Sequence, residues 1–309
     1  MKPLKPPALR KGDVIGICAP ASPPLHDGDL ERGIAYLERL GYRVELSPNL
    51  SKKNGYLAGT DRQRADDLNR LFRDRKVRAI IALRGGYGTM RILPMIDYAA
   101  VRKHPKIFVG YSDLTALQLA LWKKCRLVSF AGPMMAGGMS RGLTGYAEEI
   151  FWRMLTNTRP PGRLRARVSA RCRGKAKGIL IGGNLSTVSH LAGTPYFPDT
   201  RNCILFFEEI GEKPYRIDRM LHQLKLAGAF GAVRGVILGR FTDCEPEAGK
   251  PSLSIRRVIS DTLGGLGIPL IAGLRHGHVT GSLTLPVGLP VTMDAGKDPR
   301  IVFPWPAVS

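Results

Sequence analysis

The sequence predicts an α/β protein in which helices cover a parallel sheet, followed by a second unit richer in strands. In the first half, short apolar runs alternate with amphipathic stretches, a pattern typical of parallel strands connected by helices. The second half keeps the short apolar runs but has fewer helical stretches between them. A chain of 309 residues is also longer than one small domain usually requires.

The elements of the first half follow in order. Residues 12–19 have the pattern of a short buried strand, and residues 30–40 repeat apolar positions at helical spacing before Gly41. Further strands are expected at residues 43–46, 78–83 and 106–110, and further helices at residues 61–72 and 113–122. The last strand therefore runs through a tight turn directly into a helix.

The second half is expected to begin after an interdomain linker at residues 157–177, which contains two adjacent prolines and many basic residues. This places an N-terminal α/β domain at residues 1–156 and a C-terminal domain at residues 178–309. Within the C-terminal domain, the clearest helix covers residues 217–226, and strands are expected at residues 178–182, 203–208, 235–239 and 283–294.

Composition limits the class of protein. Hydrophobic residues make up 44% and charged residues 23% of the chain, which is ordinary for a soluble globular protein. No apolar run approaches the roughly 18 residues of a membrane span, and the prolines near the start do not fit a signal peptide. Five scattered cysteines without a C-x-x-C pair argue against a disulfide framework or a zinc ribbon. We therefore expect a cytoplasmic protein.

A net charge of +22 is the unusual bulk property, and its densest part is residues 159–177, which contain eight Arg or Lys and no acidic residue. Such a charge attracts anionic partners, so a nucleic-acid-binding protein without catalytic activity is one interpretation. However, sites for single-stranded nucleic acid usually combine basic residues with aromatic residues that stack on the bases, and no aromatic residue lies between these charges. A solvated basic segment is the favoured interpretation, and no specific nucleic-acid partner is expected.

The turn after residues 106–110 carries a candidate nucleophile, Ser112. A serine between a strand and a helix is held at the end of the sheet, where the amide of Asp113 could stabilise a developing oxyanion. Serine is equally a preferred helix N-cap, so from this segment alone both interpretations remain open. The segment is not the G-x-S-x-G elbow of an α/β-hydrolase, because Leu114 stands where that motif has its second glycine.

A glycine-rich loop at residues 84–88 directly follows the strand at residues 78–83. Glycines allow backbone amides to approach a ligand closely, so this loop is a second candidate source of oxyanion donors. A nucleotide phosphate loop is the rival interpretation. It is disfavoured because the loop matches neither G-x-x-x-x-G-K-[ST] nor G-x-G-x-x-G.

A reactive serine needs a general base and a third group that orients the base. His278, which follows a glycine in a loop before an apolar stretch, is the candidate base. The pair of His276 and His278 could also suggest a metal site, but no Cys or carboxylate lies nearby at ligand spacing, and no metal is expected. Glu208 and Glu209 both end an apolar strand, and strand parity alone leaves open which of them orients the base.

These segments together resemble the LD-carboxypeptidase family of serine peptidases, whose relatives include the microcin C self-immunity peptidases. The resemblance covers nearly the whole chain, and its order and spacing are more specific than any single motif. It is carried by residues 9–16, 55–59, 84–88, 110–117, 182–185, 208–210, 214–219, 277–278 and 285–288. One departure is Ala131-Gly132-Pro133, where the family often has His-Gly-Pro.

The resemblance implies Ser112 as nucleophile, His278 as general base, Glu208 as the orienting group, and the amides of Gly86 and Asp113 as oxyanion donors. It implies a Rossmann-like N-terminal domain, a smaller β-rich swivelling C-terminal domain and a homodimer, with no metal or organic cofactor. The implied substrate is a murein tetrapeptide that loses its terminal D-alanine during peptidoglycan recycling. The nearest alternative is a microcin-immunity-type peptidase that cleaves peptidyl or aminoacyl adenylates.

Overall fold

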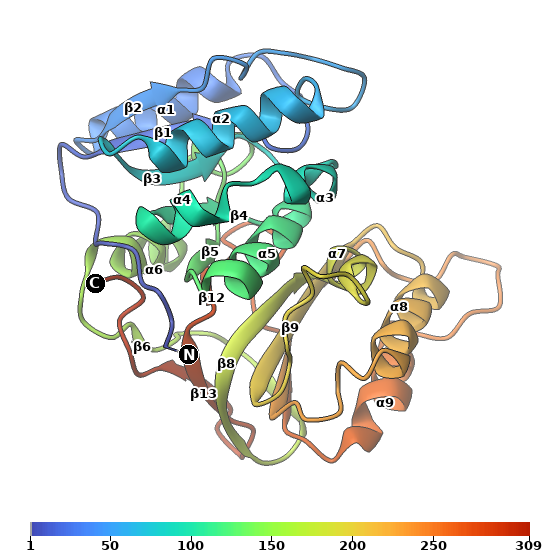
Figure 1. The fold of residues 1–309 in the computed structure, drawn as a ribbon. Coiled ribbons are helices and arrows are strands. Elements are labelled where there is room, and N and C mark those ends of the chain that lie inside the picture. Colours follow the sequence, from blue (N-terminus) through green and yellow to red (C-terminus); the bar gives the residue numbers. More distant parts are fainter. Residues whose placement is uncertain (1) are drawn as a thin grey trace.

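Two sheets form the framework of the protein in a computed structural model, which describes residues 2–309 (Figure 1). The first sheet has six strands in the order β12-β5-β4-β3-β1-β2, and the second has eight in the order β6-β14-β13-β8-β9-β10-β11-β7. None of the helices within residues 2–309 is long and apolar enough to cross a membrane.

The first sheet is mainly parallel, as the sequence predicts. Its parallel strands are β1 (Val14–Cys18), β2 (Arg43–Leu46), β3 (Val77–Ala82), β4 (Ile107–Gly110) and β5 (Ser129–Ala131). Every residue of β1 and β4 is buried, which is expected where helices cover both faces of a sheet. The antiparallel strand β12 (Leu285–Val287) is added at the edge, beside β5.

The predicted helices of the first half are confirmed to within a few residues. The α-helices are α1 (Asp29–Arg39), α2 (Asp61–Arg73), α3 (Thr89–Ile92), α4 (Tyr98–Lys103), α5 (Thr115–Cys125) and α6 (Gly145–Thr156). Short 3₁₀ turns are η1 (Leu93–Met95), η2 (Ser112–Leu114) and η3 (Met139–Arg141). A capping box between Thr60 and Gln63 fixes the start of α2.

The second sheet is mixed. Parallel strands β8 (Lys175–Asn184), β9 (Cys203–Ile210), β10 (Gly235–Thr242) and β11 (Leu270–Ala272) form its centre. Antiparallel strands β6 (Gly162–Arg163), β7 (Ser169–Cys172), β13 (Pro290–Asp294) and β14 (Arg300–Phe303) complete it. Its helical elements are α7 (Leu185–Leu191), α8 (Pro214–Leu226), α9 (Ile255–Leu263) and η4 (Gly264–Leu266).

The expected linker at residues 157–177 is wrong as a description of this segment. The segment contributes β6, β7 and the beginning of β8 to the second sheet, with Ala170 paired to Ile271 and Arg163 to Val302. β6 and β7 are the two edge strands of that sheet. Charged side chains on an edge strand oppose pairing with another chain, so a basic composition here is compatible with strands as well as with a linker.

The expected single strand at residues 283–294 is also wrong. It divides into β12, which pairs with β5 of the first sheet, and β13, which pairs with β8 of the second. The chain turns between them at Gly288, whose φ is 91°. A Cβ there would lie 2.5 Å from the Trp122 ring. Residues 178–309 therefore do not form a fully separate domain, because part of this segment belongs to the first sheet.

Candidate active site

The turn between β4 and α5 holds Ser112 in a conformation that non-glycine residues rarely adopt, with φ at 65°. Gln118 of α5 donates a hydrogen bond to the Gly110 carbonyl (3.1 Å), which ties the helix to the end of β4. The N-cap interpretation of Ser112 does not hold, because Tyr111 is the N-cap of η2 and no side chain caps that turn. The Ser112 hydroxyl is instead available to the loop that carries His278.

A continuous hydrogen-bonded path joins three side chains from both sheets. The Ser112 Oγ lies 3.1 Å from Nε2 of His278, and Nδ1 of His278 lies 2.8 Å from Oε2 of Glu208. Because a carboxylate can only accept, Nδ1 carries the proton and Nε2 is left to accept the serine hydroxyl proton. Glu208 is 1% exposed, and its other oxygen has no hydrogen-bond partner within residues 2–309. The carboxylate is therefore buried, with one oxygen directed at the imidazole.

Glycine is required where the His278 loop passes Glu208. Gly277 has a φ of 117°, and a Cβ on it would lie 2.6 Å from Oε2 of Glu208. On the other side, a Cβ on Gly239 of β10 would approach the Glu208 Cβ to 3.2 Å. The Gly277 amide donates to Oγ of Ser282 (3.0 Å), which fixes the loop. The close approach of backbone and carboxylate thus sets the imidazole position.

Glu209 points to the other face of β9, as expected for adjacent strand residues. Its Oε1 accepts from the Asn184 side chain (2.7 Å), and its Oε2 accepts from the Ser186 amide at the start of α7 (2.7 Å). Burial raises the pKa of Glu209 despite these bonds. The backbone amide of Asn184 also donates to Oγ1 of Thr115 (3.1 Å), so Glu209 helps to connect β9 with α5. Its hydrogen bonds go to Asn184, Ser186 and Ile210 and not to the imidazole.

The glycine loop lies against the serine. A Cβ on Gly85 would be 3.0 Å from the Ser112 Cβ, and a Cβ on Gly86, at a φ of 109°, would be 2.4 Å from Oγ of Ser22. That same Ser22 hydroxyl accepts a hydrogen bond from the Tyr87 amide (3.1 Å). The loop therefore needs glycine at Gly86, and at Gly85 a side chain would press closely on Ser112.

Asp113 connects the two segments that carry the expected oxyanion donors. Its carboxylate accepts from the Thr89 amide (2.8 Å), and its carbonyl accepts from the Thr89 hydroxyl (2.5 Å). Thr89 is the first residue of α3, directly after the glycine loop. Burial raises the pKa of Asp113. These bonds hold the start of α3, directly after the glycine loop, against the turn that carries Ser112.

The second histidine of the candidate metal pair has a structural role. His276 is 2% exposed, its Nδ1 lies 2.7 Å from the Leu283 carbonyl, and its ring packs edge-on against Phe206. Burial lowers the pKa of His276 and so favours the neutral ring. Residues 2–309 contain no group of three or more His, Cys, Asp or Glu side chains arranged to hold a metal ion.

Two cavities of about 360 and 370 Å³ adjoin His278, and Glu208 lines neither of them. Both are lined by Tyr111, His278 and Arg141, and the smaller one also by Ser112 and Arg84. The Tyr111 ring packs against the His278 ring with centroids 5.0 Å apart. The sequence did not single out Tyr111, although its position before Ser112 is a usable signal. It did not single out Arg141 either, which belongs to no motif.

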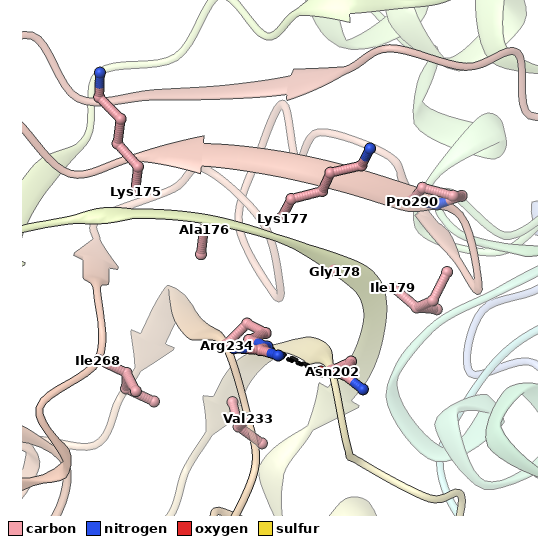
Figure 2. Close-up of a pocket in the computed structure, with 10 residues that line it drawn as sticks. All are labelled: Lys175, Ala176, Lys177, Gly178, Ile179, Asn202, Val233, Arg234, Ile268 and Pro290. Atoms are coloured by element: carbon pink, nitrogen blue, oxygen red, sulfur yellow. Dashed lines mark hydrogen bonds between the residues drawn. The ribbon is translucent and has the colours of Figure 1, made fainter.

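A third, larger cavity of about 660 Å³ is lined by residues 175–179 of β8, with Asn202 and Arg234 facing that strand (Figure 2). Its lining includes Lys175, Lys177 and Arg234 but no residue of the Ser112 site and no carboxylate. Arg234 directs Nε and Nη2 at the Asn202 side-chain oxygen, at 2.9 and 2.7 Å. The cavity is separate from the serine, and its only arginine already has a partner.

Comparison with known proteins matches both halves of the chain to models of one family. Residues 15–132 match the LD-carboxypeptidase N-terminal domain, and residues 177–293 match the LD-carboxypeptidase C-terminal domain. A probable murein peptide carboxypeptidase of Bacillus subtilis is 39% identical over 96% of this chain and 94% of its own.

Solved structures show the same fold. A muramoyltetrapeptide carboxypeptidase from Oxalobacter formigenes superimposes with a TM-score of 0.84 at 33% identity, covering 95% of this chain and 99% of its own. The microcin C7 self-immunity protein MccF, bound to aspartyl sulfamoyl adenosine, gives a TM-score of 0.89 at 28% identity, covering 99% and 100%. The chain therefore belongs to the LD-carboxypeptidase family of peptidases.

Proposed function

We propose that the protein is a serine LD-carboxypeptidase that removes the terminal D-alanine from murein tetrapeptides through an acyl-enzyme. The observation that carries the proposal is the path from Ser112 Oγ through His278 to Glu208, with both links within hydrogen-bonding distance. Relatives named as murein peptide or muramoyltetrapeptide carboxypeptidases support the substrate class. Ser112 is the nucleophile, His278 the general base and Glu208 the orienting carboxylate.

In the first half of the reaction, Nε2 of His278 takes the hydroxyl proton while Oγ of Ser112 forms a bond to the substrate carbonyl carbon. The electron pair of the C=O bond moves to its oxygen, and the amides of Gly86 and Asp113 donate hydrogen bonds to this oxyanion. When the pair returns, the C–N bond breaks and His278 gives its proton to the departing nitrogen. D-Alanine leaves, and the shortened peptide remains as an ester on Ser112.

In the second half, a water molecule takes the place of D-alanine. His278 removes one of its protons while the oxygen attacks the ester carbonyl, and the second tetrahedral intermediate expels Oγ of Ser112, which recovers a proton from His278. Throughout, Glu208 holds the imidazole in the tautomer with the proton on Nδ1 and stabilises the imidazolium. These side chains account for the whole cycle.

Cell-wall recycling in the cytoplasm is the setting that we propose for this reaction. All five cysteines are free, and four of them are buried, which is compatible with a reducing compartment. The proposal extends, through the family resemblance, to a homodimer. Sedimentation of the purified protein measures this state directly, with a mass of twice 33.8 kDa expected for the dimer.

The second candidate is a microcin-immunity-type peptidase, favoured by the likeness to MccF, whose solved complex contains aspartyl sulfamoyl adenosine. The two candidates share the Ser112 centre and differ in the leaving group. We expect a higher kcat/KM for a D-alanine-ended murein tetrapeptide than for a peptidyl-adenylate analogue. Product analysis by mass spectrometry with both substrates checks this order, and a higher value for the adenylate would favour the second candidate.

A further inference from the structure

A carboxypeptidase must recognise the free carboxylate of the residue that it releases, and a cationic group one residue beyond the cut bond gives the strongest such contact. In an acyl-transfer site this group must lie near the nucleophile and the base. Of the residues that line the two cavities beside Ser112 and His278, Arg84 and Arg141 are the permanently charged cations. The two arginines differ in whether the guanidinium already has a hydrogen-bond partner within the protein.

Arg84 already has a structural role. Its Nη1 donates to the Pro23 carbonyl (2.9 Å), and its guanidinium carbon lies 3.7 Å from the Cβ position of Gly86. Burial lowers the pKa of Arg84. This side chain therefore braces the glycine loop on the oxyanion side of the serine.

The Arg141 guanidinium has no hydrogen bond or ion pair with any side chain or carbonyl of residues 2–309, and the residue is exposed. The acidic residue of the same cavity, Asp29, does not neutralise it, because Asp29 accepts from Nη2 of Arg32 (2.7 Å). Five N–H donors in a planar fork are thus free to meet a carboxylate.

The backbone that presents Arg141 is fixed, although the side chain is free. Met139 is 1% exposed and Ser140 is 8% exposed. The Ser140 amide donates to the Met135 carbonyl (2.9 Å), and its hydroxyl accepts from the Gly137 amide (3.0 Å). A charge on a fixed segment loses less freedom on binding than a charge on a loose loop.

Arg141 also lies close enough to the reacting groups to affect them. Burial and the Glu208 charge raise the pKa of Tyr111, while the Arg141 charge opposes this rise. Tyr111 immediately precedes Ser112 and packs against His278. The guanidinium therefore lies within electrostatic range of the residues beside the scissile bond.

We propose that Arg141 binds the terminal carboxylate of the substrate and so restricts the enzyme to the last residue of a peptide. The inference rests on the proposed function and adds the residue that makes the enzyme a carboxypeptidase. A bidentate pair between guanidinium and carboxylate is the expected contact. No other charge of the two cavities is both permanent and unpaired.

The test compares a murein tetrapeptide as the free acid with the same peptide as its C-terminal amide. Release of D-alanine and of D-alaninamide gives kcat/KM for each, and their ratio is the acid preference. We expect wild type to prefer the acid, and Arg141→Gln to lower this ratio by about 10- to 100-fold, as for loss of a charge-assisted pair. Arg141→Lys should keep part of the preference, because it retains the charge without the fork.

The matched control is Arg256→Gln, which removes the same charge from an exposed position on α9 outside both cavities and should leave the ratio at its wild-type value. Circular dichroism and melting temperature verify that each variant is folded. An Arg141→Gln protein with the wild-type ratio would overturn the inference, as would a wild-type enzyme without acid preference. A wild-type protein that releases neither product would instead refute the proposed function, and the inference with it.

Discussion

His278→Ala is expected to lower kcat for D-alanine release by about 10⁶-fold, the loss seen when the base of a serine triad is removed. The reason is that Nε2 of His278, 3.1 Å from Oγ of Ser112, is the group that takes the serine proton and returns it to the leaving nitrogen. Without it, Ser112 remains a neutral hydroxyl and a poor nucleophile. A steady-state assay of D-alanine release, with substrate above KM, measures the loss.

The control for this variant is His222→Ala. His222 is an exposed histidine of α8 whose Nδ1 lies 2.9 Å from Asp218, and it lines neither cavity beside Ser112. This variant should retain wild-type kcat. If His278→Ala kept more than about one hundredth of wild-type kcat, His278 could not be the general base, because removing the base of a triad costs about 10⁶-fold.

Glu208→Gln is expected to lower kcat by about 10⁴-fold while the protein stays folded, as for the equivalent amide substitution in other serine triads. A carboxamide can donate to Nδ1 of His278, which would place the imidazole proton on Nε2 and direct it at Ser112. The imidazolium formed during attack would also lose its anionic partner in a buried site. Measurement of kcat for the variant checks this expectation, and an unchanged circular dichroism spectrum shows that the variant is folded.

Glu209→Gln is the matched control, because it changes the adjacent buried carboxylate on the opposite face of β9. Both Glu209 oxygens accept hydrogen bonds, from Asn184, Ser186 and Ile210, so an amide group must lose at least one of them. We expect a loss of about 1–3 kcal/mol in the free energy of unfolding, with a much smaller change in kcat than for Glu208→Gln. The opposite order of the two kcat values would contradict the assignment of Glu208.

Individual strands and helices of the first half could be predicted from the residue pattern of each segment alone. The alternation of apolar strands and amphipathic helices located β1 to β4 and α1, α2 and α5 because each element has its own periodicity. The basic residues 159–177 led to the wrong prediction of a linker, because charged side chains are typical of edge strands as well as of linkers. The division of residues 283–294 into β12 and β13 depends on pairing with strands more than 100 residues away in the chain, which no local pattern contains.

The candidate site was predictable to different degrees. The position of Ser112 followed from a strand that runs directly into a helix, which is a local feature. The choice between Glu208 and Glu209 depends on which face of β9 meets the loop of His278, and this is set by the packing of the second sheet. Arg141 lies on a short turn without a motif, and only the folded chain brings it beside Ser112.

The most direct test of the proposed reaction is the release of D-alanine from purified murein tetrapeptide by the wild-type protein and by Ser112→Ala. We predict one D-alanine for each shortened peptide with wild type, and release reduced to background with the folded variant. Equal release by both proteins would show that Ser112 is not the nucleophile, and no release by wild type would contradict the proposed activity on murein peptides.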